Sequence, residues 1–441
     1  MNHDSGIVHL SLYPSLFTSS NDQPVDHIVM PLQCSITSFI LVKPSHFLGV
    51  VYPTMIKKEI AHIRKQFKLD HEMLKVFDIL NVYIMKESSE VYHYECQPFA
   101  LVDREKQELY MGNFKKLLAG ELDQKLFELR FQEHAEEPSQ VLLHQGLVTG
   151  DTEEWMNLML VLVEKMLADK TYERDTVVTF IRGQYFRPTK GRNDEAEESE
   201  KDEMFAHPFI LCSVNSTEPP RNTLMFDYVE REFKYNVVVD PIIKLSAPDQ
   251  GFFYPSVTDN ASDVNRILYC AGKANEPNIH FIEQVLTAEK SVTAQEERGI
   301  FEEIVKEVAG DQFDAATIAH VYEEIHQIIE THEEEEPPRL DYRDVERMLT
   351  ASGVEDVTTE KVEQAFQTIV DDRNYELKAS SVIPKFTSKS IKIDTKIATI
   401  SVSPQDLKYV KQVNYRGKKC LLIEVDEDVV IEGFTLNTET L

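Results

Sequence analysis

Apolar residues follow Met55 at helical spacing. Ile56, Ile60, Ile63 and Phe67 stand three or four positions apart, and lysine and arginine occupy many of the positions between them. This pattern predicts an amphipathic helix with one buried face and one basic face.

Short runs of β-branched and aromatic residues follow, separated by turn residues. Asp151 gives a good N-cap to a later helix whose stripe of Trp155, Met159, Leu162, Val163 and Met166 is typical of core packing. Strands are predicted over 74–85, 91–102, 125–131, 176–186, 208–214, 222–235, within 237–245 and over 264–270, and helices over 104–119 and from Asp151. We therefore expect residues 55–275 to form an α+β domain with a largely antiparallel sheet, and the polar stretch 190–202 to be an exposed loop.

The hydrophobic period becomes helical after Pro277. Residues 276–378 are predicted as a helical segment, in which Ile318 to Ile329 form a seam of coiled-coil character. Burial of this seam within one chain is the ordinary outcome, and a homodimer through it is the alternative. Strand patterns return over 379–441, where we expect a small β module with a hairpin between 420–425 and 429–434.

Composition sets the first 54 residues apart. They contain four charged side chains and neither Glu nor Arg, whereas the chain as a whole is 28% charged. We interpret Met55 as the translation start and residues 1–54 as an extension produced by a gene-start error. A genuine N-terminal tail is the alternative.

The overall charge restricts the classes of partner. A net charge of -30 repels nucleic acid and anionic membrane on average, so a polyanion must meet a local basic patch. No window reaches 18 apolar residues, and no membrane partner is predicted. Five scattered cysteines without CxxC spacing suggest free thiols in the cytoplasm; they are Cys34, Cys96, Cys212, Cys270 and Cys420.

Such a patch occurs near the C-terminus. The stretch 384–420 has a net charge of +7, with two acids and nine cations: Lys385, Lys389, Lys392, Lys396, Lys408, Lys411, Arg416, Lys418 and Lys419. We interpret these nine residues as a binding surface for DNA or another polyanion. The alternative is that the module docks on the protein's own acidic helices.

The sequence contains none of the common catalytic motifs, and neither a catalytic residue, a metal ligand nor a cofactor is predicted. Glu323 and His326 have the spacing of a di-iron helix, but no second pair accompanies them. Asp249, Asp259 and Asp263 flank an aromatic run that looks exposed. Turn formation is their commoner use, and an unrecognised metal- or nucleotide-dependent hydrolase site is the alternative.

Three segments carry a family resemblance. They are Met55-Ile-Lys-Lys-Glu-Ile with Ile63-Arg-Lys-Gln-Phe-Lys, Gly251-Phe-Phe-Tyr-Pro-Ser, and Gly417-Lys-Lys-Cys-Leu-Leu-Ile with Glu432-Gly. From Met55 to about Phe434 the chain resembles the bacterial family catalogued as domain of unknown function 4317. The resemblance implies a start at Met55 and supplies no activity.

The tail also shows a pattern similar to bacterial nucleoid-associated proteins of roughly 37 kDa. The corresponding text is Ala398-Thr-Ile-Ser-Val-Ser, Asp406-Leu and Cys420-Leu-Leu-Ile, although Ser403-Pro404 replaces the Phe-Asp of that pattern. This resemblance implies a non-enzymatic protein bound to the chromosome. We therefore expect a cytoplasmic binding or scaffold protein that uses its basic tail.

Overall fold

The computed structural model describes residues 54–437 apart from the short gaps 88–89, 169–170, 189–203, 220–221, 238–239, 259–260, 311–312, 333–337 and 385–389. The predicted N-terminal extension and the loop 190–202 therefore lie outside the described residues, as do Lys385, Lys389 and Asp259.

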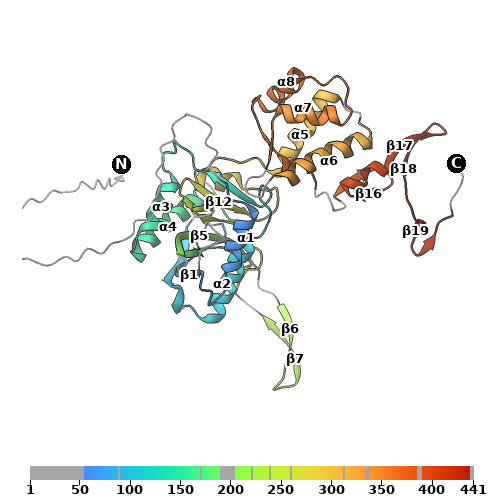
Figure 1. Ribbon diagram of the computed structural model, residues 1–441. Helices are drawn as coiled ribbons and strands as arrows, with labels where there is room; N and C mark the ends of the chain where they lie inside the picture. The colour runs from blue at the N-terminus through green and yellow to red at the C-terminus, as the bar shows by residue number, and fades with distance from the viewer. Residues whose placement is uncertain are drawn as a thin grey trace, which may run out of the picture. The chain divides into compact units, whose positions relative to one another are not determined.

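A large antiparallel sheet organises the first half of the described chain (Figure 1). The strand order is β2-β1-β4-β5-β9-β12-β3, and β8 pairs with β5. The strands are β1 (Leu74–Ile84), β2 (Val91–Pro98), β3 (Leu126–Arg130), β4 (Thr176–Pro188), β5 (Met204–Glu218), β8 (Ile242–Ile243), β9 (Gln250–Tyr254) and β12 (Arg266–Ala271).

Helices cover both faces of this sheet. One face packs against α1 (Lys57–Gln66) and α2 (Arg104–Leu117). The other packs against α3 (Ser139–Val148), α4 (Thr152–Leu167) and a π-helical turn, Phe281–Val285. The predicted α+β class is confirmed, and the apolar core of this body extends to Ala288.

The α4 prediction is confirmed in detail. Asp151 caps the helix by accepting hydrogen bonds from two backbone amides, and Trp155, Met159, Leu162, Val163 and Met166 are all buried in the core.

The aromatic run at 252–254 is not exposed, contrary to the prediction. Phe252 and Tyr254 enter the core on one face of the sheet, whereas Phe253 enters the core on the other. The strand is central, so both alternating faces are buried. A side chain at Gly251 would place its Cβ 2.1 Å from the Cys212 carbonyl oxygen, so the strand pairing requires glycine there.

Helices dominate the part of the predicted helical segment that follows Ala288. It contains α5 (Ala294–Ala309), α6 (Ala315–Thr331), α7 (Tyr342–Ala351), α8 (Thr359–Val370) and the short α9 (Ala379–Val382), with a two-residue pairing of β13 (Arg339–Leu340) and β14 (Leu377–Lys378). Val321 and Ile325 of the α6 seam are buried in the core of these helices. Residues of the same chain thus cover the seam that was considered for dimerisation.

Three smaller hairpins form the C-terminal module. They pair β15 (Ile391–Asp394) with β16 (Thr399–Val402), β17 (Val410–Tyr415) with β18 (Lys418–Ile423), and β19 (Val430–Ile431) with β20 (Phe434–Thr435). The predicted hairpin between 420–425 and 429–434 is wrong. Positive φ angles at Arg416 and Gly417, and again at Glu432 and Gly433, make two tight turns that pair each strand with a nearer neighbour.

Two further hairpins form separate two-stranded sheets within the first half of the described chain. The predicted strand 222–235 is in fact β6 (Asn222–Asp227) and β7 (Glu232–Val237), because the Asp227 carboxylate accepts hydrogen bonds from the amides of Val229 and Glu230 and turns the chain. The other hairpin pairs β10 (Ser256–Thr258) with β11 (Ala261–Asp263).

One buried arginine joins the sheet to the α3–α4 layer. Arg182 of β4 donates from Nε to Asp78 Oδ2 of β1 at 2.6 Å, from Nη1 to the Thr149 carbonyl at 2.9 Å, and from Nη2 to Thr152 Oγ1 at 3.1 Å. Its guanidinium also lies 5.2 Å from the Trp155 ring centroid. Each of the three nitrogen atoms of the planar guanidinium thus donates to a different part of the fold: to β1, to the residue after α3, and to the first residue of α4.

Loss of this guanidinium should destabilise the body strongly. Arg182→Met leaves the Asp78 carboxylate buried without its cation, and we expect a loss of about 3–5 kcal/mol in the free energy of unfolding, measured by chemical denaturation. Replacing Asp78 as well, as Asp78→Leu with Arg182→Met, should recover part of this loss. The exposed Arg104→Gln is the matched control, and an Arg182→Met change no larger than this control would refute the role of Arg182.

Candidate functional site

The C-terminal module packs against α6 through apolar side chains. Leu407 and Val410 of the module are buried against Ala319 of α6, with Ile391, Ile393, Val402 and Leu421 packed around them. The module does dock on a helix of its own chain, as the alternative reading proposed, but the contact does not depend on the basic residues.

The seven basic candidates that the structure describes are all exposed: Lys392, Lys396, Lys408, Lys411, Arg416, Lys418 and Lys419. Lys392 lies on the strand face opposite Ile391 and Ile393, which pack toward α6. Within the described part of the chain, Lys411 alone of these seven forms an ion pair, at 2.6 Å from Glu424. The remaining cations are available to an external anion.

Three of these cations gather at the tip of the β17–β18 hairpin. Arg416 and Gly417 have φ values of 52° and 78°, as in a two-residue type I′ turn. Lys418 pairs with Tyr415 and Lys419 pairs with Asn414 directly beside this turn. The Arg416 guanidinium lies 4.9 Å from the Tyr415 ring centroid. We call Arg416, Lys418 and Lys419 the basic tip; guanidinium and ammonium groups are the side chains that bind phosphate oxygens most often.

Acidic residues occupy the opposite end of the same hairpin. Glu424 follows β18 directly and accepts the Lys411 ion pair, and Asp426, Glu427 and Asp428 follow in an exposed stretch. A six-residue strand spans about 20 Å, so this acidic end lies far from the basic tip. The tip carries three of the nine cations counted over 384–420, and the acids that follow β18 offset positive charge at the other end of this hairpin.

The aspartates of the alternative enzyme site are not brought together. The Asp249 carboxylate accepts the Ser216 amide at 2.6 Å, and Asp263 lies 3.3 Å from Arg266 Nε. Asp263 pairs with Ser256, which lies seven positions along the chain from Asp249, so an extended backbone places the two aspartates on the order of 20 Å apart. Asp259 lies outside the described residues.

A polar cluster that the sequence did not reveal lies near the β10–β11 hairpin; in it Tyr185 and His207 are buried, whereas His62 is exposed. His62 Nδ1 shares a hydrogen bond with the hydroxyl of buried Tyr185, whose ring lies 6.1 Å from that of His207. His207 is 5% exposed and its Nδ1 lies 2.9 Å from Ser262 Oγ. Burial raises the pKa of Tyr185 to about 12 and, with nearby Arg187, lowers the pKa of both histidines.

These residues come from α1, β4, β5 and β11, so no local motif could have linked them. Buried phenol and imidazole groups can serve acid–base chemistry, and the same groups equally stabilise a polar end of a sheet.

His326, which has the spacing of a di-iron helix with Glu323, lies 3.2 Å from Glu330 of the same helix. Among the described residues, no group of three or more His, Cys, Asp or Glu side chains is placed to hold a metal ion.

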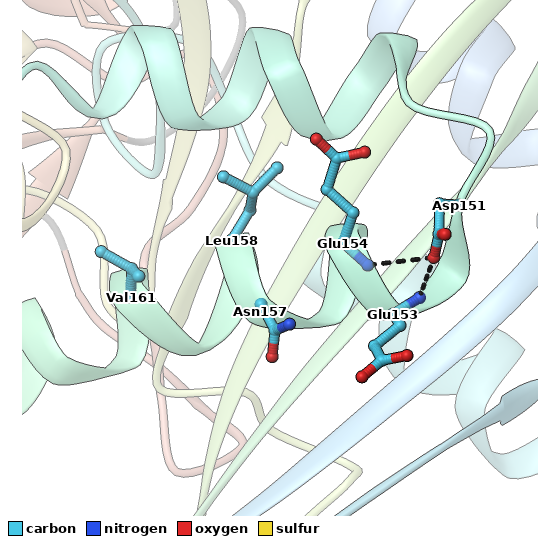
Figure 2. Close-up of a pocket in the computed structure, with 6 residues that line it drawn as sticks. All are labelled: Asp151, Glu153, Glu154, Asn157, Leu158 and Val161. Carbon is cyan, nitrogen blue, oxygen red and sulfur yellow. Dashed lines mark hydrogen bonds between the residues drawn. The ribbon is translucent and has the colours of Figure 1, made fainter. Parts of the chain in front are cut away.

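A surface hollow of about 400 Å³ lies along the first turns of α4 (Figure 2). Figure 2 shows that its carboxylates are close to the helix start, where Asp151 accepts the amides of Glu153 and Glu154. Glu154 also accepts the Thr149 hydroxyl. Helix capping therefore accounts for the acidic residues of this hollow.

A second hollow, of about 730 Å³, lies beside the π-helical turn. Lys165 on its wall donates to the Glu137 carbonyl and lies 3.1 Å from Ser139 Oγ, and its partial burial lowers its pKa. Ser139 is fully buried and donates its hydroxyl to the Val285 carbonyl at 2.6 Å. Both side chains thus tie α3 and α4 to the π-helical turn.

A family model described as Domain of unknown function (DUF4317) matches residues 55–434. The chain belongs to this family. The match begins at Met55, whose buried side chain lies beside α1 and whose amide donates to Glu128 Oε2 at 3.2 Å. A comparison with curated proteins found no match. Over the described residues, no helix combines the length and the apolar character needed to cross a membrane.

The buried histidine of the DUF4317 chain should make its stability depend on pH. Because the folded-state pKa of His207 is lowered from 6.5, the unfolded chain binds more protons once the pH falls below about 6.5. The free energy of unfolding should then decrease until the pH passes the folded-state pKa. We expect His207→Gln to flatten this decrease in denaturation curves measured between about pH 7 and pH 5, with each unit of pKa shift corresponding to about 1.4 kcal/mol.

The exposed His93 on β2 provides the control. His93→Gln should leave the pH dependence unchanged. If His207→Gln and wild type lose stability in parallel over this range, the imidazole of His207 is not its source.

Proposed function

We propose that this protein is a non-enzymatic binding protein of the cytoplasm that contacts a polyanion, with chromosomal DNA as the first candidate, through the basic tip of its C-terminal module. The proposal rests on the separation of the module's apolar contacts from its exposed cations. Apolar residues such as Leu407 and Val410 attach it to α6, which leaves the exposed Arg416, Lys418 and Lys419 free for an external contact.

Charge supports a focused contact over a general one. The chain carries a net charge of -30, so DNA is repelled over most of the surface and an approach is favourable only where cations concentrate. Exposed charges interact over roughly a Debye length, about 10 Å at moderate salt, so the cations of the tip attract an anion that approaches the tip itself. Affinity for DNA should therefore be low and steeply dependent on salt.

The cysteines agree with a cytoplasmic location. Cys96, Cys212, Cys270 and Cys420 are free thiols in the structure. Cys212 and Cys270 are fully buried, and burial raises the pKa of Cys270 to about 12, which keeps that thiol protonated and unreactive.

Neutralising the basic tip should weaken retention on DNA. We expect the triple variant Arg416→Gln, Lys418→Gln, Lys419→Gln to reduce the slope of log affinity against log salt by about two to three units, as expected for the loss of about one phosphate contact per cation. Fluorescence anisotropy with labelled duplex DNA, over a series of salt concentrations, measures the slope.

The matched control removes the same charge elsewhere in the module, as Lys392→Gln, Lys396→Gln, Lys408→Gln. This variant should keep most of the wild-type slope. Absence of DNA binding by the wild-type protein at low salt rejects the proposal, and equal losses in the two variants would show that net charge, not the tip, controls binding.

A second candidate function, a metal- or nucleotide-dependent hydrolase, rests on the cluster of His62, Tyr185 and His207. This cluster extends the site first considered at 249–263, because Ser262 contacts His207. Buried imidazole and phenol groups with shifted pKa values are found at catalytic sites more often than elsewhere.

Thermal-shift measurements test the enzyme candidate. A ligand at about 100 times its dissociation constant should add about 2.7 kcal/mol of stability at one site. Divalent cations and nucleotides are the probes, and the shift should be lost in His207→Gln. A set of probes that leaves the melting temperature unchanged would count against this candidate and would not affect the polyanion proposal.

A further inference from the structure

The β6–β7 hairpin is a two-stranded sheet of its own (Figure 1), and its two faces differ in character. Its register places Leu224 opposite Tyr235 and Phe226 opposite Phe233. Because directly paired residues share a face and successive pairs alternate, these four side chains project from one side of the ribbon. The Tyr228 ring joins them through an edge contact 5.3 Å from the Phe226 ring centroid. We call Leu224, Phe226, Tyr228, Phe233 and Tyr235 the aromatic face.

The opposite side of the ribbon is polar. Lys234 lies there, 2.9 Å from Asp227 and 3.4 Å from Glu232, so its charge is balanced within the hairpin. Met225 is the apolar residue paired across from Lys234. The hairpin thus has the two-sided pattern of a sheet that covers a hydrophobic surface with one face.

The aromatic face is exposed to an unusual degree. The exposed fractions are 70% for Leu224, 38% for Phe226, 87% for Tyr228, 73% for Phe233 and 64% for Tyr235. Single exposed apolar residues are common, but a contiguous set of five on one ribbon marks an interaction surface. A two-stranded hairpin is also marginally stable in water unless its hydrophobic face is covered.

Charge and area indicate what covers this face. It carries no ionised group, which gives a polyanion nothing to bind, and the nearby acids Asp227, Glu230 and Glu232 oppose anionic lipid. Aromatic side chains bury about 150–250 Å² each, so two such faces in contact would remove roughly 1,000 Å² in total from water. This area is the lower bound for a specific interface between two copies.

We propose that β6–β7 is the dimerisation element of this protein, and that two copies stack their aromatic faces about a two-fold axis. A two-fold interface must be complementary to itself, and an uncharged face meets that condition without opposing like charges. The Phe226–Phe233 cross-strand pair, whose ring centroids are 5.2 Å apart, lies at the middle of the face, where anchor residues of interfaces concentrate. This inference is independent of the proposed polyanion contact.

The net charge of the chain determines how the dimer responds to salt. Two bodies of charge -30 repel each other, whereas the aromatic contact does not depend on screening. Salt should therefore strengthen association of the protein with itself. The proposed DNA contact has the opposite dependence, so the two activities can be separated in one set of buffers.

Sedimentation equilibrium of the full-length protein, without DNA, tests the proposal. At 50 mM and 500 mM NaCl we expect a monomer–dimer equilibrium, with the dimer at least several-fold tighter at the higher salt concentration. Phe233→Ser and, separately, Tyr235→Ser should weaken association at least tenfold. Met225→Ser, a change of the same kind on the opposite face of the ribbon, should leave it within about twofold.

Phe233 and Tyr235 are both exposed, so substitution should leave the fold intact, and an unchanged thermal unfolding curve verifies that the variants fold. A protein that remains monomeric at both salt concentrations overturns the proposal. A dimer that survives Phe233→Ser and Tyr235→Ser has its interface elsewhere and overturns it as well. If the free chain is monomeric and instead binds zwitterionic phosphatidylcholine vesicles through Phe233, the face serves a membrane and the proposal is wrong.

Discussion

The contact between Arg182 and Asp78 determines how the layers of the main body are joined. The two residues lie on paired strands, β4 and β1, and remain almost fully buried. A buried ion pair stabilises a fold only when its remaining hydrogen-bonding groups are satisfied, and here the carbonyl of Thr149 and the hydroxyl of Thr152 accept two further hydrogen bonds from the guanidinium. The arginine thereby fixes the α3–α4 turn over one point of the sheet.

The large sheet places apolar and aromatic side chains on both of its faces. Both of its faces are covered by helices, so alternate residues of a single strand contribute to two separate cores. Tyr185 and Phe209 pack on the α1–α2 side, whereas their strand neighbours Phe180 and Ile210 pack on the α3–α4 side. Polar residues near the strand ends, such as His207, are then buried by the surrounding loops and hairpins, which produces the polar cluster.

Periodicity predicted the elements that depend on local pattern. The α4 stripe beginning at Trp155, the pairing of two neighbouring strands around residues 176–214 and the helices of residues 294–370 follow from spacing that the sequence displays directly. The burial of Phe252 and Phe253 did not, because a short apolar strand flanked by aspartates has the same pattern whether or not a second layer covers it.

The candidate site was predictable in composition and not in geometry. The basic residues near the C-terminus were evident in the sequence. Their division between a hairpin tip and a paired lysine depends on the turn at Arg416-Gly417, which lacks the Asn-Gly or Asp-Gly typical of such turns. His62, Tyr185 and His207 meet only after α1, β4 and β5 have packed, and their separation along the chain hides the contact.

The turn at Arg416 has a consequence for recognition. A non-glycine residue in the left-handed region carries conformational strain of about 1 kcal/mol or more, which the hairpin pairing on either side must sustain. With its backbone fixed in this way and its guanidinium resting on the Tyr415 ring, the side chain has lost much of its rotational entropy before any ligand arrives. In the proposed polyanion contact, preorganisation of this kind would lower the entropic penalty of binding and would favour anions whose shape matches the fixed guanidinium.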